Sequence, residues 1–381
     1  MDFGFTDDQQ MLRRTVREFA ESEIAPHVRH LDEAQEFPRE ILKKAGDLGL
    51  MGIIFPDEYG GAALGYTEYV IAVEELSRVD GSVGISVAAH NSLCANHIFQ
   101  YGTGEQKRRF LGPLLSGQWI GAWSLTEPTA GSDAAGTRSV AKAVPEGWVL
   151  NGSKTFTTHG SVGDVTVVFA VSDPEQGKQG ISAFVIPKGT PGFRPGRKED
   201  KMGLRASDTS EVIMDDCRVG PDALLGERGH GFVDAMKVLY GGRISIAALA
   251  LGMARGAYDA AVRYARERQQ FGRAIAEFQA IQFMLAEMAT RIDAAELLVH
   301  KAAWMKDHGM KTTKESSMAK LYASETGVYV ADRALQIFGG YGYVKDFPAE
   351  KFYRDVKLCT IGEGTSEIQR LVIAREILGR L

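Results

Sequence analysis

The chain has 381 residues, 44% of them hydrophobic and 24% charged, which is enough for two or three domains around a large buried core. Its net charge of −5 and its pI near 6.0 argue against a protein that binds nucleic acid or a membrane surface through basic patches. No apolar run approaches the roughly 18 residues of a membrane span. The acidic opening MDFGFTDDQQ lacks the character of a signal or transit peptide. We expect a cytoplasmic protein, or an organellar one after removal of a leader.

Cysteine and histidine are sparse and scattered. Cys94, Cys217 and Cys359 lie far apart without a C-x-x-C motif, so a disulfide framework or a cysteine zinc site is not expected. His90 and His97 could align on a helix, but core or surface histidines are much commoner than a metal site. We predict no metal.

The first third of the chain has a helical pattern, from Phe5 to about Leu115. Thr6-Asp-Asp-Gln9 forms a capping box ahead of apolar residues at helical spacing. The segment Phe55-Pro-Asp-Glu-Tyr-Gly-Gly61 breaks the pattern. Helices are expected again over 66–79 and 82–101.

The pattern changes in the middle third to short β-branched runs bounded by turn residues. Strands are expected over 148–151, 165–171, 181–186 and 211–214. Strands of this length and spacing predict an antiparallel β-barrel or sandwich.

The last third returns to long amphipathic patterns, over 244–270, 279–307, 313–338 and 366–379. Four long helices predict a four-helix bundle. The chain is therefore expected to be an α+β protein with an N-terminal all-α domain (1–119), a middle β domain (120–229) and a C-terminal bundle (230–381). No glycine cluster follows a strand within a βαβ unit, which argues against a nicotinamide-binding Rossmann domain.

Four stretches, taken together and in this order, resemble one known family. They are Ala122-Trp-Ser-Leu-Thr-Glu-Pro-Thr-Ala-Gly-Ser-Asp133, Arg266-Glu-Arg-Gln-Gln-Phe-Gly-Arg273 with Phe278-Gln-Ala-Ile-Gln282, Gln336-Ile-Phe-Gly-Gly-Tyr-Gly342, and Ile361-Gly-Glu-Gly-Thr-Ser-Glu-Ile-Gln-Arg370. With the α–β–α framing they resemble the acyl-CoA dehydrogenases of short- and medium-chain type, over essentially the whole chain.

The resemblance implies a flavoenzyme with non-covalent FAD. Such an enzyme oxidises an acyl-CoA thioester to the trans-2-enoyl-CoA and passes electrons to an electron transfer flavoprotein. It implies a homotetramer, with no nucleic-acid or membrane partner, in fatty-acid or branched or cyclic acyl metabolism. The location would be the bacterial cytoplasm or the mitochondrial matrix.

Glu363 resembles the family's catalytic base, which removes the α-proton of the substrate. Ser366-x-x-Gln369 indicates a capping box, so a helix N-terminus should begin just beyond Glu363 and favour an anion there. An apolar acyl group would expel water and raise the carboxyl pKa toward the working pH. Without the family motifs, the same glutamate would be interpreted as a solvated loop acid.

Some relatives place the base immediately before the arginine of Leu239-Tyr-Gly-Gly-Arg243. Gly242 occupies that position here and cannot act as a base, which favours Glu363. By resemblance Arg243, with Tyr240, lies on the substrate and CoA side. The alternative for Arg243 is a surface arginine near a helix start.

The resemblance assigns most other positions to FAD. Trp123, Leu125 and Thr126 would bind the flavin pyrimidine edge, Gly131 and Ser132 would lie between flavin and CoA, and Phe156 and Thr158 would lie beside the flavin ring. For Phe156 alone, a core strand aromatic is the alternative. Residues matched to the pyrophosphate and adenosine half of a neighbouring subunit's FAD are Arg268, Phe271, Gln279, Gln336, Ile337, Gly339 and Gly340. The two glycines could instead simply end the 313–338 helix. Thr365 and Glu367 would touch the cofactor, and Gly364 the substrate.

The clearest departure from the family is Gly362, where a bulky residue, often tyrosine, usually precedes the base. Its loss predicts room for a branched, cyclic or otherwise bulky acyl group. Phe156, Thr157, His159 and the pair Tyr240-Gly241 also depart from the usual pattern, and their effect is left open. Two alternatives remain: an acyl-CoA oxidase that uses O₂, and a non-catalytic flavin- or CoA-binding protein.

Overall fold

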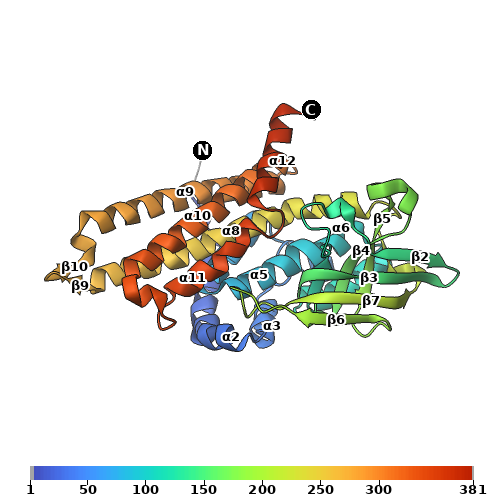
Figure 1. The fold of residues 1–381 in the computed structure, drawn as a ribbon, viewed down its shortest axis with the longest axis horizontal. Coiled ribbons are helices and arrows are strands. Elements are labelled where there is room, and N and C mark those ends of the chain that lie inside the picture. The colour runs from blue at the N-terminus through green and yellow to red at the C-terminus, as the bar shows by residue number, and fades with distance from the viewer. Residues whose placement is uncertain (1–3, 380–381) are drawn as a thin grey trace.

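The computed structural model describes residues 4–379 and has three parts in chain order: helices, a sheet, and long helices (Figure 1). This confirms the predicted α–β–α order. The sheet lies at one end of an elongated molecule and the tip of the long helices lies at the other. The domain boundaries at 119/120 and 229/230 stay predictions.

Within the described residues, seven α-helices precede the sheet. They are α1 (Asp7–Phe19), α2 (Val28–Ala34), α3 (Arg39–Asp47), α4 (Tyr66–Val79), α5 (Gly81–Ala89), α6 (Asn96–Tyr101) and α7 (Gly104–Leu115). The capping box of Thr6 and Gln9 is confirmed, and α4 has the predicted bounds. The predicted helix over 82–101 contains a π-helical turn at His90–Ala95 that separates α5 from α6. His90 and His97 are both fully buried, so they are core residues.

The middle part is one open sheet and not a closed barrel. Its strands are β1 (Gly121–Ser124), β2 (Val140–Val144), β3 (Gly147–Thr158), β4 (Val165–Val171), β5 (Ile181–Pro187), β6 (Phe193–Lys198), β7 (Thr209–Val219) and β8 (Leu224–Leu225). The order is β6-β7-β3-β2-β4-β5-β8, with β1 beside β4. The predicted middle β domain is confirmed, but it is a mixed sheet and not the expected antiparallel barrel or sandwich, because β1 and β2 both run parallel to β4.

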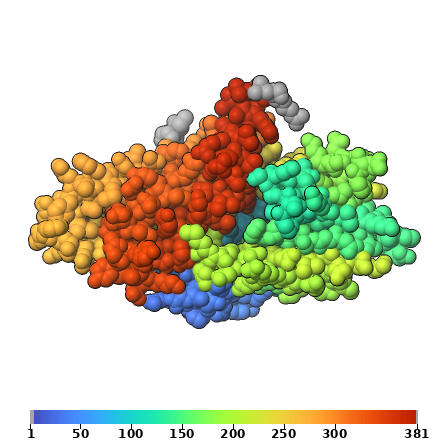
Figure 2. All heavy atoms as spheres, in the orientation of Figure 1, coloured from blue at the N-terminus to red at the C-terminus, as the bar shows by residue number. Residues whose placement is uncertain are grey.

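The C-terminal part contains α8 (Gly231–Glu267), a hairpin of β9 (Gln269–Gln270) and β10 (Arg273–Ala274), α9 (Gln279–Asp307), α10 (Thr313–Phe338), α11 (Ala349–Val356) and α12 (Ser366–Leu378). The α9 and α10 bounds are as predicted, whereas α8 begins 13 residues before the predicted residue 244. Gly241 and Gly242 suggest a break, but both are buried within α8, so tertiary packing overrides their low helix propensity. The far end of α12 projects from the molecule (Figures 1 and 2).

The central helix α8 packs against both helical parts. It contacts α4, α5, α9 and α10, and its middle belongs to one hydrophobic core shared with α1 and α4. Its first turns belong to a second core with α7 and the inner face of the sheet. The helix is long and apolar enough to span a membrane, but 83% of its most apolar window is buried inside the structure. It is therefore a core helix.

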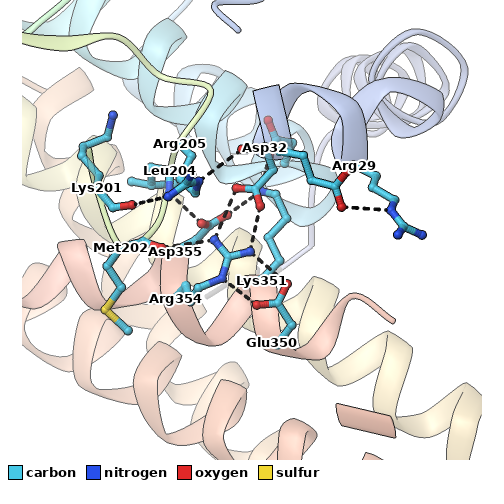
Figure 3. A network of polar contacts seen from close by, with 12 residues as sticks. Arg29, Asp32, Lys201, Met202, Leu204, Arg205, Glu350, Lys351, Arg354 and Asp355 are labelled. Carbon is cyan, nitrogen blue, oxygen red and sulfur yellow. Dashed lines mark hydrogen bonds and ion pairs between the residues drawn. The ribbon is translucent and has the colours of Figure 1, made fainter. Parts of the chain in front are cut away.

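An ion-pair network joins all three parts of the chain (Figure 3). On α11, Lys351 Nζ donates to Asp80 Oδ1 and Asp355 Oδ2, each at 2.5 Å. Asp355 also accepts a hydrogen bond from the backbone N–H of Leu204 at 2.6 Å, and Arg354 pairs with Asp32 at 2.8 Å. Because Asp80 and Asp355 are each only 1% exposed, Lys351 supplies the counter-charge for two buried acidic residues.

Candidate active site

Glu363 lies in a short loop between the end of α11 and the start of α12. The loop is folded back on Leu358, whose carbonyl accepts hydrogen bonds from the N–H groups of Ile361 and Gly362, both at 2.8 Å. Glu363 has a φ of 53° and Gly364 a φ of 94°. A left-handed conformation is uncommon for a non-glycine residue and is typical of functional loops.

The carboxyl group of Glu363 points at Gly242 of α8. A β-carbon built on Gly242 would lie 2.1 Å from Glu363 Oε2 and 2.9 Å from Cδ. Any side chain at position 242 would therefore overlap the glutamate. The two positions considered for a base, 242 and 363, share one space, and only the glycine leaves room for the carboxylate.

Two buried cations lie near this carboxyl group, Arg243 on α8 and Lys320 on α10. Arg243 is 5% exposed, which overturns its interpretation as a surface residue. Its guanidinium lies 5.5 Å from the centre of the Tyr240 ring, and its Nη1 donates to Ser317 Oγ at 3.4 Å. Lys320 is fully buried, and its Nζ donates to the carbonyl of Gly364 at 2.7 Å.

The carboxyl group is poised to exchange a proton near neutral pH. Glu363 Oε2 is buried and has no hydrogen-bond partner within the described residues. Burial raises the Glu363 pKa to about 7, because desolvation outweighs the opposing charges of Lys320 and Arg243. The interpretation of Glu363 as a solvated acid is therefore wrong.

The helix that follows begins one residue earlier than the predicted capping box implies. Thr365 is the N-cap residue of α12, and its side chain accepts from the N–H of Ile368 at 3.3 Å. Gln369 does not reach back to a backbone N–H. Its Nε2 donates to the carbonyls of Gly364 and Glu363, at 2.9 and 3.3 Å. Ser366 and Gln369 thus do not form a capping box, because the amide hydrogen-bonds the preceding loop.

A second group of predicted residues lies at the end of β1. Trp123 and Thr126 are half-buried, Leu125 is buried, and Gly131 and Ser132 are exposed beyond the turn that Glu127 and Ala130 close with two backbone hydrogen bonds. Beneath this loop, Lys154 Nζ donates to Glu127 Oε1 at 2.7 Å and to the carbonyl of Leu125 at 3.2 Å. This buried pair fixes the loop and was not identified from the sequence.

Phe156 and Thr158 lie near this loop on the irregular end of β3. The register of β3 against β7 shifts between Lys154 and Thr157, and Phe156 adopts a φ of 54°. The Phe156 ring is 65% exposed, so it is not the core aromatic that was considered as the alternative. An exposed aromatic face beside a polar loop suits a planar ligand such as a flavin ring.

A third group lines a pocket of about 620 Å³ at the far end of the long helices. Arg268, Ile337, Gly339 and Gly340 are among its lining residues, and Arg268 lies 5.4 Å from the centre of the Tyr341 ring. Gly339 ends α10 with a φ of 60°, so the helix-ending role is confirmed and is compatible with a lining role. Gln279 and Gln336 are exposed, and Phe271 is 93% exposed at the tip of the β9–β10 hairpin.

Within one chain, the predicted residues after β1 lie far from the predicted residues around the Arg268 pocket. The loop after β1 belongs to the sheet at one end of the molecule, whereas the β9–β10 hairpin is at the other (Figure 1). Thr365 is half-buried and Glu367 is exposed at the start of α12. One extended cofactor bound on the sheet could reach the Arg268 pocket only if a second chain supplied that pocket.

One other cluster could resemble a metal site. Glu74, Glu296 and His300 bring their ligand atoms within 4.8 Å of one another. Arg255 pairs with both carboxylates, at 2.7 Å for Glu296, and so offsets part of the acidic charge that would attract a metal ion.

Comparisons with known proteins agree with this α–β–α fold. Residues 6–118, 122–217 and 229–378 match the N-terminal, middle and C-terminal domains of acyl-CoA dehydrogenase, respectively. The short-chain specific acyl-CoA dehydrogenase of Clostridium acetobutylicum is 48% identical over 99% of this chain and 100% of its own. The NADH-dependent acryloyl-CoA reductase of Anaerotignum propionicum is 46% identical over 100% of this chain and 97% of its own.

Among solved structures, one described as the electron transferring flavoprotein of Acidaminococcus fermentans, in work on flavin-based electron bifurcation, contains a chain 49% identical to this one. The two chains cover each other completely, with a TM-score of 0.98.

The fold and the site define an oxidoreductase of the flavoprotein class, whose members take FAD as cofactor. The chain belongs to the acyl-CoA dehydrogenase family.

Proposed function

We propose that this enzyme catalyses the α,β-dehydrogenation of an acyl-CoA thioester to the trans-2-enoyl-CoA, with Glu363 as the base. The observation that supports this best is the Glu363 carboxyl group. It is held on a strained loop, has a buried oxygen without a protein partner, and has a pKa raised to about 7. The α-hydrogen of a thioester is a very weak acid, so its removal requires a base poised in this way.

Each residue has a defined task in this scheme. The carboxylate takes the α-proton, and the backbone N–H of Glu363 donates to the thioester oxygen as negative charge develops there. Arg243 and Tyr240 line the substrate side, together with Ser132, Gly362 and Gly364. Bound FAD supplies the acceptor for the β-hydride at its N5 atom.

The residues available for FAD fit its two chemical halves. The exposed Phe156 ring, the half-buried Thr158 and the loop of Trp123, Leu125, Thr126 and Gly131 suit the flavin. Arg268 presents a guanidinium that suits a diphosphate, in the pocket lined by Ile337, Gly339 and Gly340. Phe271, Gln279, Gln336, Thr365 and Glu367 complete the proposed set. Because these halves lie at opposite ends of the chain, the proposal requires a homo-oligomer, and we propose a tetramer.

The proposed electron acceptor is an electron transfer flavoprotein, since the description of the solved structure that contains a chain 49% identical to this one names such a protein. An acyl-CoA oxidase activity is the competing possibility. Reoxidation of the reduced enzyme by O₂, compared with reoxidation by an electron transfer flavoprotein, separates the two.

The decisive experiment is anaerobic reduction of the purified yellow protein by butyryl-CoA. Wild type is expected to bleach, whereas Glu363→Gln should retain its flavin and lose bleaching by at least about 10²-fold, because the amide cannot accept the proton. Glu175→Gln, an exposed residue far from α12 in sequence, is the matched control and should bleach at the wild-type rate. Bleaching of Glu363→Gln at the wild-type rate would remove the proposed base.

We further propose that the acyl group is bulky, branched or cyclic. A β-carbon on Gly362 would lie 3.6 Å or more from its nearest neighbours, which belong to Leu358, so a side chain would fit there with ordinary contacts and its absence leaves volume beside the base. Gly362→Tyr is expected to favour linear over branched thioesters relative to wild type. A wild type that strongly prefers linear butyryl-CoA would contradict this proposal.

A further inference from the structure

Lys320 is the least expected residue of the site. It lies on α10 among small buried residues such as Ser316, Ala319 and Ala323, and its side chain is fully buried. Burial of an ammonium group is unfavourable unless the charge is used. Its described hydrogen bond goes to a neutral acceptor, the carbonyl of Gly364, at 2.7 Å.

The same carbonyl is held from the other side by α12. Gln369, also fully buried, donates from Nε2 to Gly364 O at 2.9 Å and to Glu363 O at 3.3 Å. Both donors thus bind the carbonyl of the peptide between Gly364 and Thr365, and Gln369 alone also binds the preceding peptide, between Glu363 and Gly364. These two peptides flank Gly364 and follow Glu363, which has a φ of 53°, a left-handed conformation that a non-glycine residue keeps only when its surroundings hold it.

Lys320 also acts on Glu363 through its charge, whereas Gln369 is neutral. The groups that face the carboxyl group, among the described residues, are Lys320 from α10, Arg243 from α8, Tyr69 from α4 and Cys359 from the segment before the loop. Burial raises the pKa values of the Tyr69 hydroxyl and the Cys359 thiol, so both are neutral. Lys320 and Arg243 therefore supply the positive charge beside the carboxyl group.

We propose that Lys320 is a positioning residue for the base: its hydrogen bond to Gly364 holds the strained loop that aims Glu363 at Gly242, and its positive charge favours the ionised form of the carboxyl group. This inference rests on the proposed role of Glu363. It assigns to one lysine two effects that substitutions can separate.

The test compares three variants by the pH dependence of kcat/KM. Lys320→Gln retains a donor but loses the charge, so the acid limb should move up by about one pH unit while the plateau changes little. Gln369→Leu removes two loop hydrogen bonds but no charge, so the plateau should fall with the acid limb in place. Lys320→Met loses both, so the limb should shift and the plateau should fall by about 10- to 100-fold, as for a misplaced catalytic group.

Flavin content and the infrared carboxyl band of Glu363, identified by its absence in Glu363→Gln, provide readouts independent of turnover. If Lys320→Met loses its flavin or unfolds, Lys320→Gln and Gln369→Leu decide the question. A wild-type pH profile and plateau in a folded Lys320 variant would overturn the inference, as would an equal limb shift in Gln369→Leu. Failure of the proposed function has a different signature, namely unimpaired bleaching in Glu363→Gln.

Discussion

Gly242→Ala tests the packing of the active site with the smallest possible change. The added methyl group would lie 2.1 Å from Glu363 Oε2, whereas ordinary contact begins at 3.4 Å, so the carboxylate must move by about 1.3 Å. A misplacement of about 1 Å can lower the rate by about 10²-fold. The group that moves is the end of a flexible side chain, so the fold should tolerate the change.

The expected result is a kcat about 10²-fold below wild type in a protein with unchanged flavin content and a melting temperature close to that of wild type. The assay is steady-state reduction of an artificial dye by butyryl-CoA, together with a thermal melt. Gly112→Ala is the control, because it lies within α7 and a β-carbon there meets nothing within 4 Å. That control should keep full activity. A fully active Gly242→Ala enzyme would refute the inferred contact between position 242 and the carboxylate.

Four further outcomes are expected. Since the Glu363 pKa is raised to about 7, kcat/KM should rise as the pH increases through 7. Because the Glu363 pKa is higher in the folded state, that state binds more protons than the unfolded chain between about pH 4.3 and 7. As the pH rises through this range, thermal melts should show wild type losing stability relative to Glu363→Gln. A stability difference that does not change with pH would contradict the raised pKa. Lys351→Met should lower the free energy of unfolding by about 3–5 kcal/mol in denaturant titrations, because Asp80 and Asp355 stay buried without their cation. The control Lys345→Met changes an exposed lysine and should alter the free energy of unfolding by less than about 0.5 kcal/mol. Arg268→Lys should weaken FAD retention by about 10-fold, because lysine lacks the paired N–H donors of the guanidinium group. Equal FAD retention in Arg268→Lys and in the control Arg266→Lys, which changes an exposed residue, would count against the proposed pyrophosphate site.

Much of the secondary structure could be predicted from local pattern. The bounds of α4, α9, α10 and β4 agree with the periodicity of their residues, because one face of each helix is buried and β4 is an apolar run bounded by turn residues. The start of α8 could not be predicted in this way. Gly241 and Gly242 look like a helix break, and only the closeness of Tyr66 and Glu363 explains why glycines stand there.

Whether the sheet stays open or closes into a barrel likewise depends on contacts between strands, which the sequence of a single strand does not encode. The short runs predicted strands, but a parallel pairing of β1 and β2 with β4 joins segments far apart in the chain. Strand length and turn chemistry do not specify such partners, so an open mixed sheet and a closed antiparallel barrel have similar local patterns.

By itself, the sequence determined the α–β–α order, the family resemblance and the identity of Glu363 as the candidate base, because these depend on local motifs and their spacing. Only the tertiary structure decided that the carboxylate is buried against Gly242, that Arg243 is a core residue, and that Lys320 and Gln369 hold the loop. Burial and desolvation depend on which distant helices pack together, and those contacts set the pKa of the base.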